Sequence, residues 1–263
     1  MSSKQDDLKE TNTEARFEFK KEEKSAFQTE KGLTEETVRV ISEDKDEPEW
    51  MLERRLRALE QFQEMPMPTD WPGQPDLSEV DVDEIVPYIR PDVDVRAGVD
   101  DWTELPDDIK DTFDKLGIPE AEKNALSGVG AQYESEVVYQ NMQERWEEKG
   151  VIFCNMDEAV QEHEELVREH FMTKCVPPSD NKFAALHGAI WSGGSFVYIP
   201  ENTTVDMPVQ AYFRMNSEGM GQFEHTLIIA EEGSEVHYIE GCSAPKYSKF
   251  NLHCGGVEVF VDE

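Results

Sequence analysis

The sequence predicts an α+β protein in which helices come first and a β-rich region follows. Apolar residues recur at helical spacing between residues 50 and 62. After about residue 183, glycines separate short runs that are rich in β-branched and aromatic residues. Four prolines between residues 66 and 75 interrupt the chain and indicate a linker.

The N-terminal part divides into a tail and a helical region. Residues 1–28 are polar and charged with little hydrophobic pattern, which predicts a disordered acidic tail. Residues 29–130 are expected to form a helical region that contains the proline-rich linker. Thr34 is the expected N-cap of a first helix, Pro48 begins a second, and short helices are expected over 106–126.

The rest of the chain divides into a connecting region and a β-rich core. Residues 131–182 are expected to be an α/β connection, with helices near 136–148 and 157–172 around a strand at 151–154. Residues 183–263 form the expected core, with strands at 195–199, 209–215, 223–230, 235–239 and 257–261. Short strands with glycine turns are typical of a barrel, a sandwich or a β-helix.

The net charge of −33 covers the whole chain. Residues 1–130 hold 35 acidic and 17 basic side chains, and residues 131–263 hold 23 and 8. Such self-repulsion is relieved when salt shortens the Debye length, so we expect a protein adapted to a very saline, halophilic cytoplasm. Nucleic-acid binding is disfavoured because phosphate contacts need clustered lysine and arginine.

The four cysteines indicate a reducing compartment. They are unevenly spaced and include no CxxC pair, which argues against a zinc ribbon or a disulfide framework. The sequence has no signal-peptide pattern and no apolar run of membrane-spanning length, so we expect a cytoplasmic protein that does not enter a membrane. It also has no phosphate-binding loop of the Gly-Lys-Ser/Thr type, so this chain is not expected to bind or hydrolyse ATP.

Cys242 is the first candidate for chemistry. It lies in the run EGCSAP at 240–245, directly after an alternating apolar and polar stretch. A thiol at the end of a strand, next to a glycine and proline turn, can be held rigidly and still be reached from outside. The alternative is a small buried hydrophobe, which is the ordinary environment of a free cysteine.

Other polar residues of the β-rich region suggest a second kind of site. Arg214 and Asn216 are two residues apart, so on a strand they face the same side, either near an anionic sulfur species or in a surface ion pair.

Imidazole, thiolate and carboxylate groups can together bind iron or zinc. The residues that would do so are His225, His237, Glu240, Cys242, His253 and Cys254. His253 and Cys254 are adjacent, so they need a bulge to share one ion.

Several long segments resemble the SufB family, whose members are scaffold subunits of the SUF iron–sulfur cluster assembly machinery. The segments occur in the family's order from about residue 33 to the end of the chain. They are ISEDKDEPEWMLERRLRAL at 41–59, YESEVVY at 133–139, GSFVYIP at 194–200, GQFEHTLIIA at 221–230 and EGCSAP at 240–245.

The resemblance implies a right-handed parallel β-helix after the N-terminal helical region. It implies a non-enzymatic scaffold that pairs with SufD, with ATP hydrolysis supplied by the SufC ATPase. Cys242 matches the cysteine that accepts persulfide sulfur from a cysteine desulfurase and its shuttle, of the SufS with SufE or SufU type. Arg214 and Asn216 match polar residues of the sulfur route.

The expected product is a transient iron–sulfur cluster, delivered to apo acceptor proteins, and a requirement for reduced flavin stays open. The chain stops at Glu263, before the further coils and the helical domain that the resemblance implies, so the β-helix is expected to be incomplete. A fragment, a broken gene and one half of a split protein are all consistent with this. Cys254 is an additional thiol relative to the family pattern.

Two other functions are consistent with the residues. A cupin-like metalloprotein or enzyme would use His225, His237, Glu240 and His253. A purely structural remnant would carry an unreactive Cys242.

Overall fold

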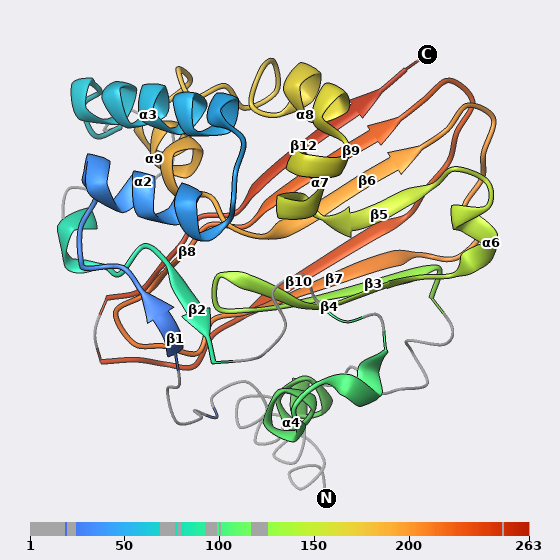
Figure 1. Ribbon diagram of the computed structural model, residues 1–263, viewed down its shortest axis with the longest axis horizontal. Coiled ribbons are helices and arrows are strands. Elements are labelled where there is room, and N and C mark those ends of the chain that lie inside the picture. Colours follow the sequence, from blue (N-terminus) through green and yellow to red (C-terminus); the bar gives the residue numbers. More distant parts are fainter. Residues whose placement is uncertain are drawn as a thin grey trace, which may run out of the picture.

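The computed structural model describes residues 19, 25–68, 77, 80–92, 99, 101–116, 126–248 and 250–262. It confirms a mixed α+β architecture with helices early and most strands late (Figure 1). Two four-stranded sheets lie one above the other in the view. Helices α7 and α8 lie over the upper sheet, and α2, α3 and α9 group beside the end where its parallel strands begin. No helix in these ranges is long and apolar enough to cross a membrane.

The first two helices begin where the sequence predicts. Helix α2 (Glu35–Asp44) is capped by Thr34, whose hydroxyl accepts a hydrogen bond from the Thr37 amide, and α3 (Glu49–Glu64) follows Pro48. Most of the predicted disordered tail lies outside the described residues. Its last four residues instead form strand β1 (Ser25–Gln28), because they pair antiparallel with β2 (Ile89–Pro91).

The segment between α3 and the sheets contains short elements. These are the 3-10 turns η1 (Val82–Glu84) and η2 (Trp102–Glu104) and helix α4 (Asp107–Leu116). Helix α4 lies within the range predicted for short helices and buries Ile109 and Phe113. The proline-rich linker is described only at residues 66–68, which belong to no helix or strand, and the rest of it lies outside the described ranges.

The lower sheet has the strand order β10-β7-β3-β4. Strands β3 (Gly128–Tyr133) and β4 (Glu136–Met142) form an antiparallel hairpin, so the helix predicted near 136–148 is wrong except for the short α6 (Glu144–Glu147). The boundary predicted at residue 130 therefore falls inside a strand. Strands β7 (Val209–Arg214) and β10 (Tyr238–Ser243) continue the sheet in parallel from β3.

The upper sheet has the order β12-β9-β6-β5. Strand β5 (Ile152–Asn155) is antiparallel to β6 (Gly194–Ile199), whereas β6, β9 (His225–Ala230) and β12 (Gly256–Val261) are parallel. The register is regular: Gly194 pairs with His225, and His225 pairs with Gly256, each 31 residues further along. The same spacing joins β8 (Gly221–Gln222) to β11 (Leu252–His253).

Three further helices pack against this sheet. Helices α7 (Met156–Glu162) and α8 (Glu164–His170) agree with the helix predicted at 157–172. Helix α9 (Lys182–Ile190) occupies the start of the region that the sequence assigned to β structure. It is capped by Asn181 and buried on almost all sides, so its apolar residues show little helical period.

Candidate functional site

Cys242 lies within strand β10, not after its end. The strand continues to Ser243 because β10 pairs residue by residue with β7, where Cys242 is opposite Phe213. Strand β10 is at the edge of the described sheet, and Cys242 is an exposed free thiol. The thiol is exposed, as the prediction of a reachable cysteine requires, but it lies within a strand and not after its end.

The imidazole of His253 contacts the Cys242 thiol. His253 comes from β11, and its Nε2 also bonds Oε1 of Glu224, a carboxylate that is almost completely buried. The hydrogen bond to Cys242 and then the bond to Glu224 raise the pKa of His253 to about 10. Thiol, imidazole and carboxylate thus form one hydrogen-bonded chain, in which the imidazole is a cation at neutral pH.

A second carboxylate lies near this chain. Glu240, on β10, accepts hydrogen bonds from the Thr226 hydroxyl at 2.7 Å and the Tyr238 hydroxyl at 3.2 Å. Burial raises the pKa of Glu240, and the charge on Glu224 raises it further, while His253 lowers it. Negative charge therefore gathers around the His253 cation.

Arg214 lies on the opposite face of β10 and β7 from the thiol. It pairs with Ser243, whose hydroxyl accepts a hydrogen bond from Arg214 Nη1 at 3.3 Å, and adjacent strand residues face opposite sides. The guanidinium is fully buried, and burial lowers its pKa. The cation in contact with Cys242 is consequently His253 and not Arg214.

Asn216 lies beyond the end of β7, so the expectation that it shares a strand face with Arg214 is wrong. Both residues instead contact Glu134, in the turn between β3 and β4. The Glu134 amide donates to the Arg214 carbonyl at 2.9 Å, and Glu134 Oε2 accepts from the Asn216 amide at 3.0 Å. Ser217 donates to the other carboxylate oxygen at 2.7 Å. Glu134 therefore fixes the end of the strand that carries Arg214.

Cys254 does not share a site with His253. It is partly buried against the core formed by α2, α3 and α9, and burial, then the charge of Glu224, raises the pKa of its thiol to about 12. The described residues contain no group of three or more His, Cys, Asp or Glu side chains placed to hold a metal ion. The metal-like pair predicted from adjacency therefore has no third ligand in those ranges.

The four residues of the cupin-like alternative have separate partners. His237 is exposed and lies 4.0 Å from Glu235, while Glu240 bonds Thr226 and Tyr238. His225 is completely buried. These residues do not converge on one centre.

His225 belongs instead to a buried histidine pair that the sequence analysis missed. His187 of α9 lies with Nε2 2.9 Å from His225 Nδ1 and with Nδ1 2.9 Å from the Cys254 carbonyl. His225 Nε2 lies 3.2 Å from Oε2 of the fully buried Glu258. Burial lowers the pKa of His187 to about 3 and also lowers that of His225. Both rings are therefore neutral parts of the core.

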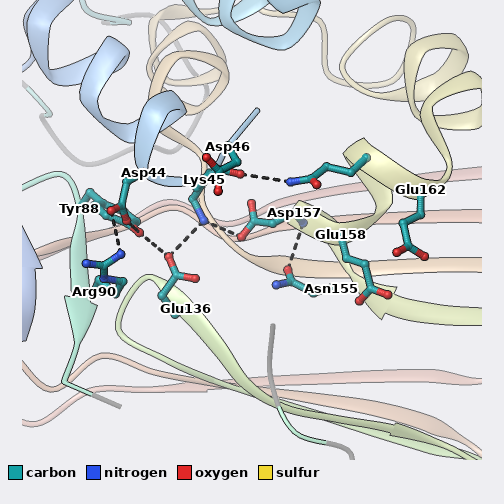
Figure 2. Close-up of a pocket in the computed structure, with 11 residues that line it drawn as sticks. Asp44, Lys45, Asp46, Tyr88, Arg90, Glu136, Asn155, Asp157, Glu158 and Glu162 are labelled. Atoms are coloured by element: carbon teal, nitrogen blue, oxygen red, sulfur yellow. Dashed lines mark hydrogen bonds and ion pairs between the residues drawn. The ribbon is translucent and has the colours of Figure 1, made fainter. Parts of the chain in front are cut away.

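An acidic hollow of about 410 Å³ opens between α2, β2, β4 and α7 (Figure 2). At its centre, Lys45 Nζ lies 3.1 Å from Glu136 Oε1 and 2.5 Å from Asp157 Oδ2. The Tyr88 hydroxyl donates to Glu136 at 2.6 Å, and burial raises the pKa of both Tyr88 and Glu136. Lys45 pairs with both carboxylates, so this buried network links segments that are far apart in the sequence.

Comparisons with known proteins find two family regions in this chain. Residues 101–211 match the SufBD protein N-terminal region, and residues 213–263 match the family described as SUF system FeS cluster assembly, SufBD core domain. Curated relatives include iron–sulfur cluster assembly SufBD family proteins from Staphylococcus saprophyticus, Staphylococcus epidermidis and Staphylococcus aureus. Each is 56% identical to this chain over 245 or 246 residues, which cover 93% or 94% of it.

The aligned part is 51% of each relative, so the chain spans about half the length of the curated relatives it matches. Within that half, the match is nearly continuous, and the two family regions follow each other without overlap. The chain belongs to the SufBD family of the SUF iron–sulfur cluster assembly system.

Proposed function

We propose that this chain is a SufB-type scaffold part that accepts persulfide sulfur at Cys242 during iron–sulfur cluster assembly. The observation that carries the proposal is an exposed thiol in hydrogen-bonding contact with a cationic imidazole. A thiolate, not a thiol, is the nucleophile in sulfur exchange, and a neighbouring cation favours it. The family match supports the same role.

The proposed step is a transfer of one sulfur atom without net oxidation. The Cys242 thiolate attacks the outer sulfur of a donor persulfide, and a new S–S bond forms. The donor's own S–S bond breaks, and its electron pair leaves with the donor thiolate. Cys242 then carries a persulfide, which is the sulfur source for a transient cluster that is the cargo of the scaffold.

The partners are proposals of the same kind. They are SufD, the SufC ATPase, a SufS-type cysteine desulfurase with a SufE- or SufU-type shuttle, and apo acceptor proteins. ATP hydrolysis belongs to SufC in this proposal, and the chain itself acts as a scaffold without enzymatic activity. We also propose a right-handed parallel β-helix, which the 31-residue spacing between stacked parallel strands supports.

Arg214 and Asn216 remain proposed parts of the sulfur route. Arg214 bonds Ser243, the neighbour of Cys242, and Asn216 is fixed by the same Glu134 that bonds the Arg214 backbone. Their placement behind the strand favours an indirect role, in which they hold the Cys242 strand in place. The reacting thiol is then influenced directly by His253 alone among these three.

Persulfide trapping tests the acceptor role. The chain is incubated with a desulfurase, its shuttle and cysteine, then alkylated, digested and analysed by mass spectrometry. We expect additional sulfur on Cys242, and none on Cys175, which is also an exposed free thiol and serves as the internal control. The Cys242→Ser variant should lose the signal. Equal sulfur on both cysteines, or none on Cys242 of the folded chain, would contradict the proposal.

We further propose that the acidic excess adapts this protein to a saline cytoplasm. With a net charge of −33, self-repulsion should weaken as salt shortens the Debye length from about 10 Å at 0.1 M to about 3 Å at 1 M. Thermal unfolding should therefore move to higher temperature between 0.1 M and 1 M potassium chloride. A melting temperature that is constant or falls over this range argues against halophilic adaptation.

A further inference from the structure

Three side chains from separate segments form a chain of contacts in which His253 lies between Cys242 and Glu224. Cys242 comes from β10, His253 from β11, and Glu224 from the short link between β8 and β9. We infer that His253 is a catalytic residue for sulfur acceptance at Cys242 and that Glu224 is the residue that positions it. This inference deepens the proposed function, because it assigns the groups that make the acceptor thiol reactive.

The burial of Glu224 is the first argument. Its side chain is only 2% exposed, its Oε1 bonds His253, and its Oε2 is buried without a hydrogen-bond partner among the described residues. A desolvated carboxylate is costly unless it is paired with a cation. His253 is the cation that contacts it, so the carboxylate holds the imidazole in its protonated form.

Backbone pairing fixes the two partners. His253 pairs with Gln222 in the β8–β11 ladder, and the Gly256 amide donates to the Glu224 carbonyl at 2.9 Å. At Gly255, a Cβ atom would lie 2.7 Å from Glu224 Oε1, so the absence of a side chain there leaves space for the carboxylate. The carboxylate is therefore held against the imidazole by the fold and not by a flexible surface contact.

The protonated imidazole can donate a hydrogen bond to the Cys242 sulfur and to the Glu224 carboxylate at the same time. A protonated histidine has a donor on each ring nitrogen, whereas a thiolate and a carboxylate are both acceptors. His253 is 36% exposed, so a donor persulfide can reach the thiol beside it. Thiolate, imidazolium and carboxylate in this order form the arrangement that activates nucleophilic cysteines in general.

The proton follows a closed path in the transfer step. As the Cys242 thiolate bonds the outer sulfur of the donor persulfide, the donor's inner sulfur leaves with the electron pair of the broken S–S bond. His253 gives its proton to that leaving thiolate. The new Cys242 persulfide then returns its own proton to His253, so the products are a donor thiol and a Cys242 persulfide anion beside an imidazolium.

Other charged or titratable groups surround His253. Some favour its protonated form and others do not. Besides Glu224 and Cys242, they are Glu240 on β10, Cys254, which directly follows β11, and His187 on α9. Glu240 favours the cation, whereas His187 is a neutral core histidine and Cys254 is a protonated thiol at neutral pH. The contacts with Cys242 and then Glu224 therefore favour the charged form of the ring most strongly.

The test is the pH dependence of alkylation at each cysteine. The whole folded chain is treated with iodoacetamide between pH 5.5 and 9, and the rates at Cys242 and Cys175 are read from the same digest. In the wild type, Cys242 should react faster than Cys175 at pH 6.5, because a cationic imidazole next to a thiol favours the thiolate. Cys175 is the exposed thiol with which that rate is compared.

The variants separate the two roles. His253→Gln should slow Cys242 alkylation at pH 6.5 by at least about tenfold and give it the profile of Cys175. Glu224→Gln should give a smaller loss with the same change of profile, and Cys254→Ala should leave Cys242 unchanged. Melting temperatures confirm that each variant is folded, and Cys175 reports any general change in access.

Each outcome decides the inference. A wild-type Cys242 that follows the Cys175 profile, or a folded His253→Gln variant that reacts like the wild type, overturns it. Persulfide trapping on the same samples tests the proposed function separately. Sulfur on an unactivated Cys242 keeps the proposed function and removes this inference. An activated Cys242 that takes no sulfur removes the proposed function and leaves His253 only the activation of the thiol.

Discussion

Replacing Gly194 with alanine is expected to destabilise the protein by more than about 3 kcal/mol, from left-handed strain together with overpacking. Gly194 begins β6 with φ +100°, and an added Cβ would lie 2.0 Å from the backbone oxygen of His225 and 2.5 Å from its carbonyl carbon and its amide nitrogen. The obstacle is the backbone of the paired strand β9, so no side-chain rotation can relieve it. Urea unfolding measures the loss.

Gly219→Ala is the matched control. Gly219 also has a positive φ, +77°, but an added Cβ would meet nothing within 4 Å. This variant should therefore show only the conformational penalty, about 1 kcal/mol or slightly more. If Gly194→Ala loses no more stability than Gly219→Ala, the close approach of β6 and β9 is not the dominant constraint at that position.

The parts of the fold that could be predicted are those determined by local chemistry. Thr34 caps α2 through the Thr37 amide, and Pro48 precedes α3, because a cap and a proline act within one turn of chain. The glycine-separated strands β6 and β7 were predicted with ends within one residue of those observed. Each of these signals is contained in fewer than ten residues.

The parts that failed depend on distant partners. Strand β4 looked helical, but it is fixed by its hairpin with β3. Helix α9 is too uniformly apolar to show a helical period, because the fold buries it on nearly every side. Strand β10 was expected at 235–239 and lies at Tyr238–Ser243, because its ends follow the register with β7.

The candidate site also combines residues that can be identified from local sequence with residues whose roles depend on distant partners. Cys242 could be identified from its own segment, and His253 was selected, although as a metal ligand. Glu224 and His187 could not be identified, because their roles appear only when segments 29 and 38 residues apart come into contact. The repeat of 31 residues between Gly194, His225 and Gly256 is the sequence signal that could have revealed this stacking.

The stability of the protein is expected to fall as the pH decreases below about 6.5, because the core contains a neutral histidine pair. Burial holds the pKa of His187 at about 3, and it also lowers the pKa of His225. Between pH 6.5 and 3, His187 binds a proton in the unfolded chain but stays unprotonated in the folded chain. Each pH unit in this window therefore lowers the free energy of unfolding by about 1.4 kcal/mol through His187.

Two histidine variants isolate this contribution from the protonation of carboxylates. His187→Gln removes the buried titrating ring and keeps a side chain that can hydrogen-bond, so its unfolding free energy should depend less steeply on pH between 6.5 and 4.5. His237→Gln removes an exposed histidine and should retain the wild-type slope. Urea titrations at several pH values provide the slopes. Parallel slopes for His187→Gln and the wild type would mean that the buried pair takes up protons in the folded state, with Glu258 as the counter-charge that accommodates them.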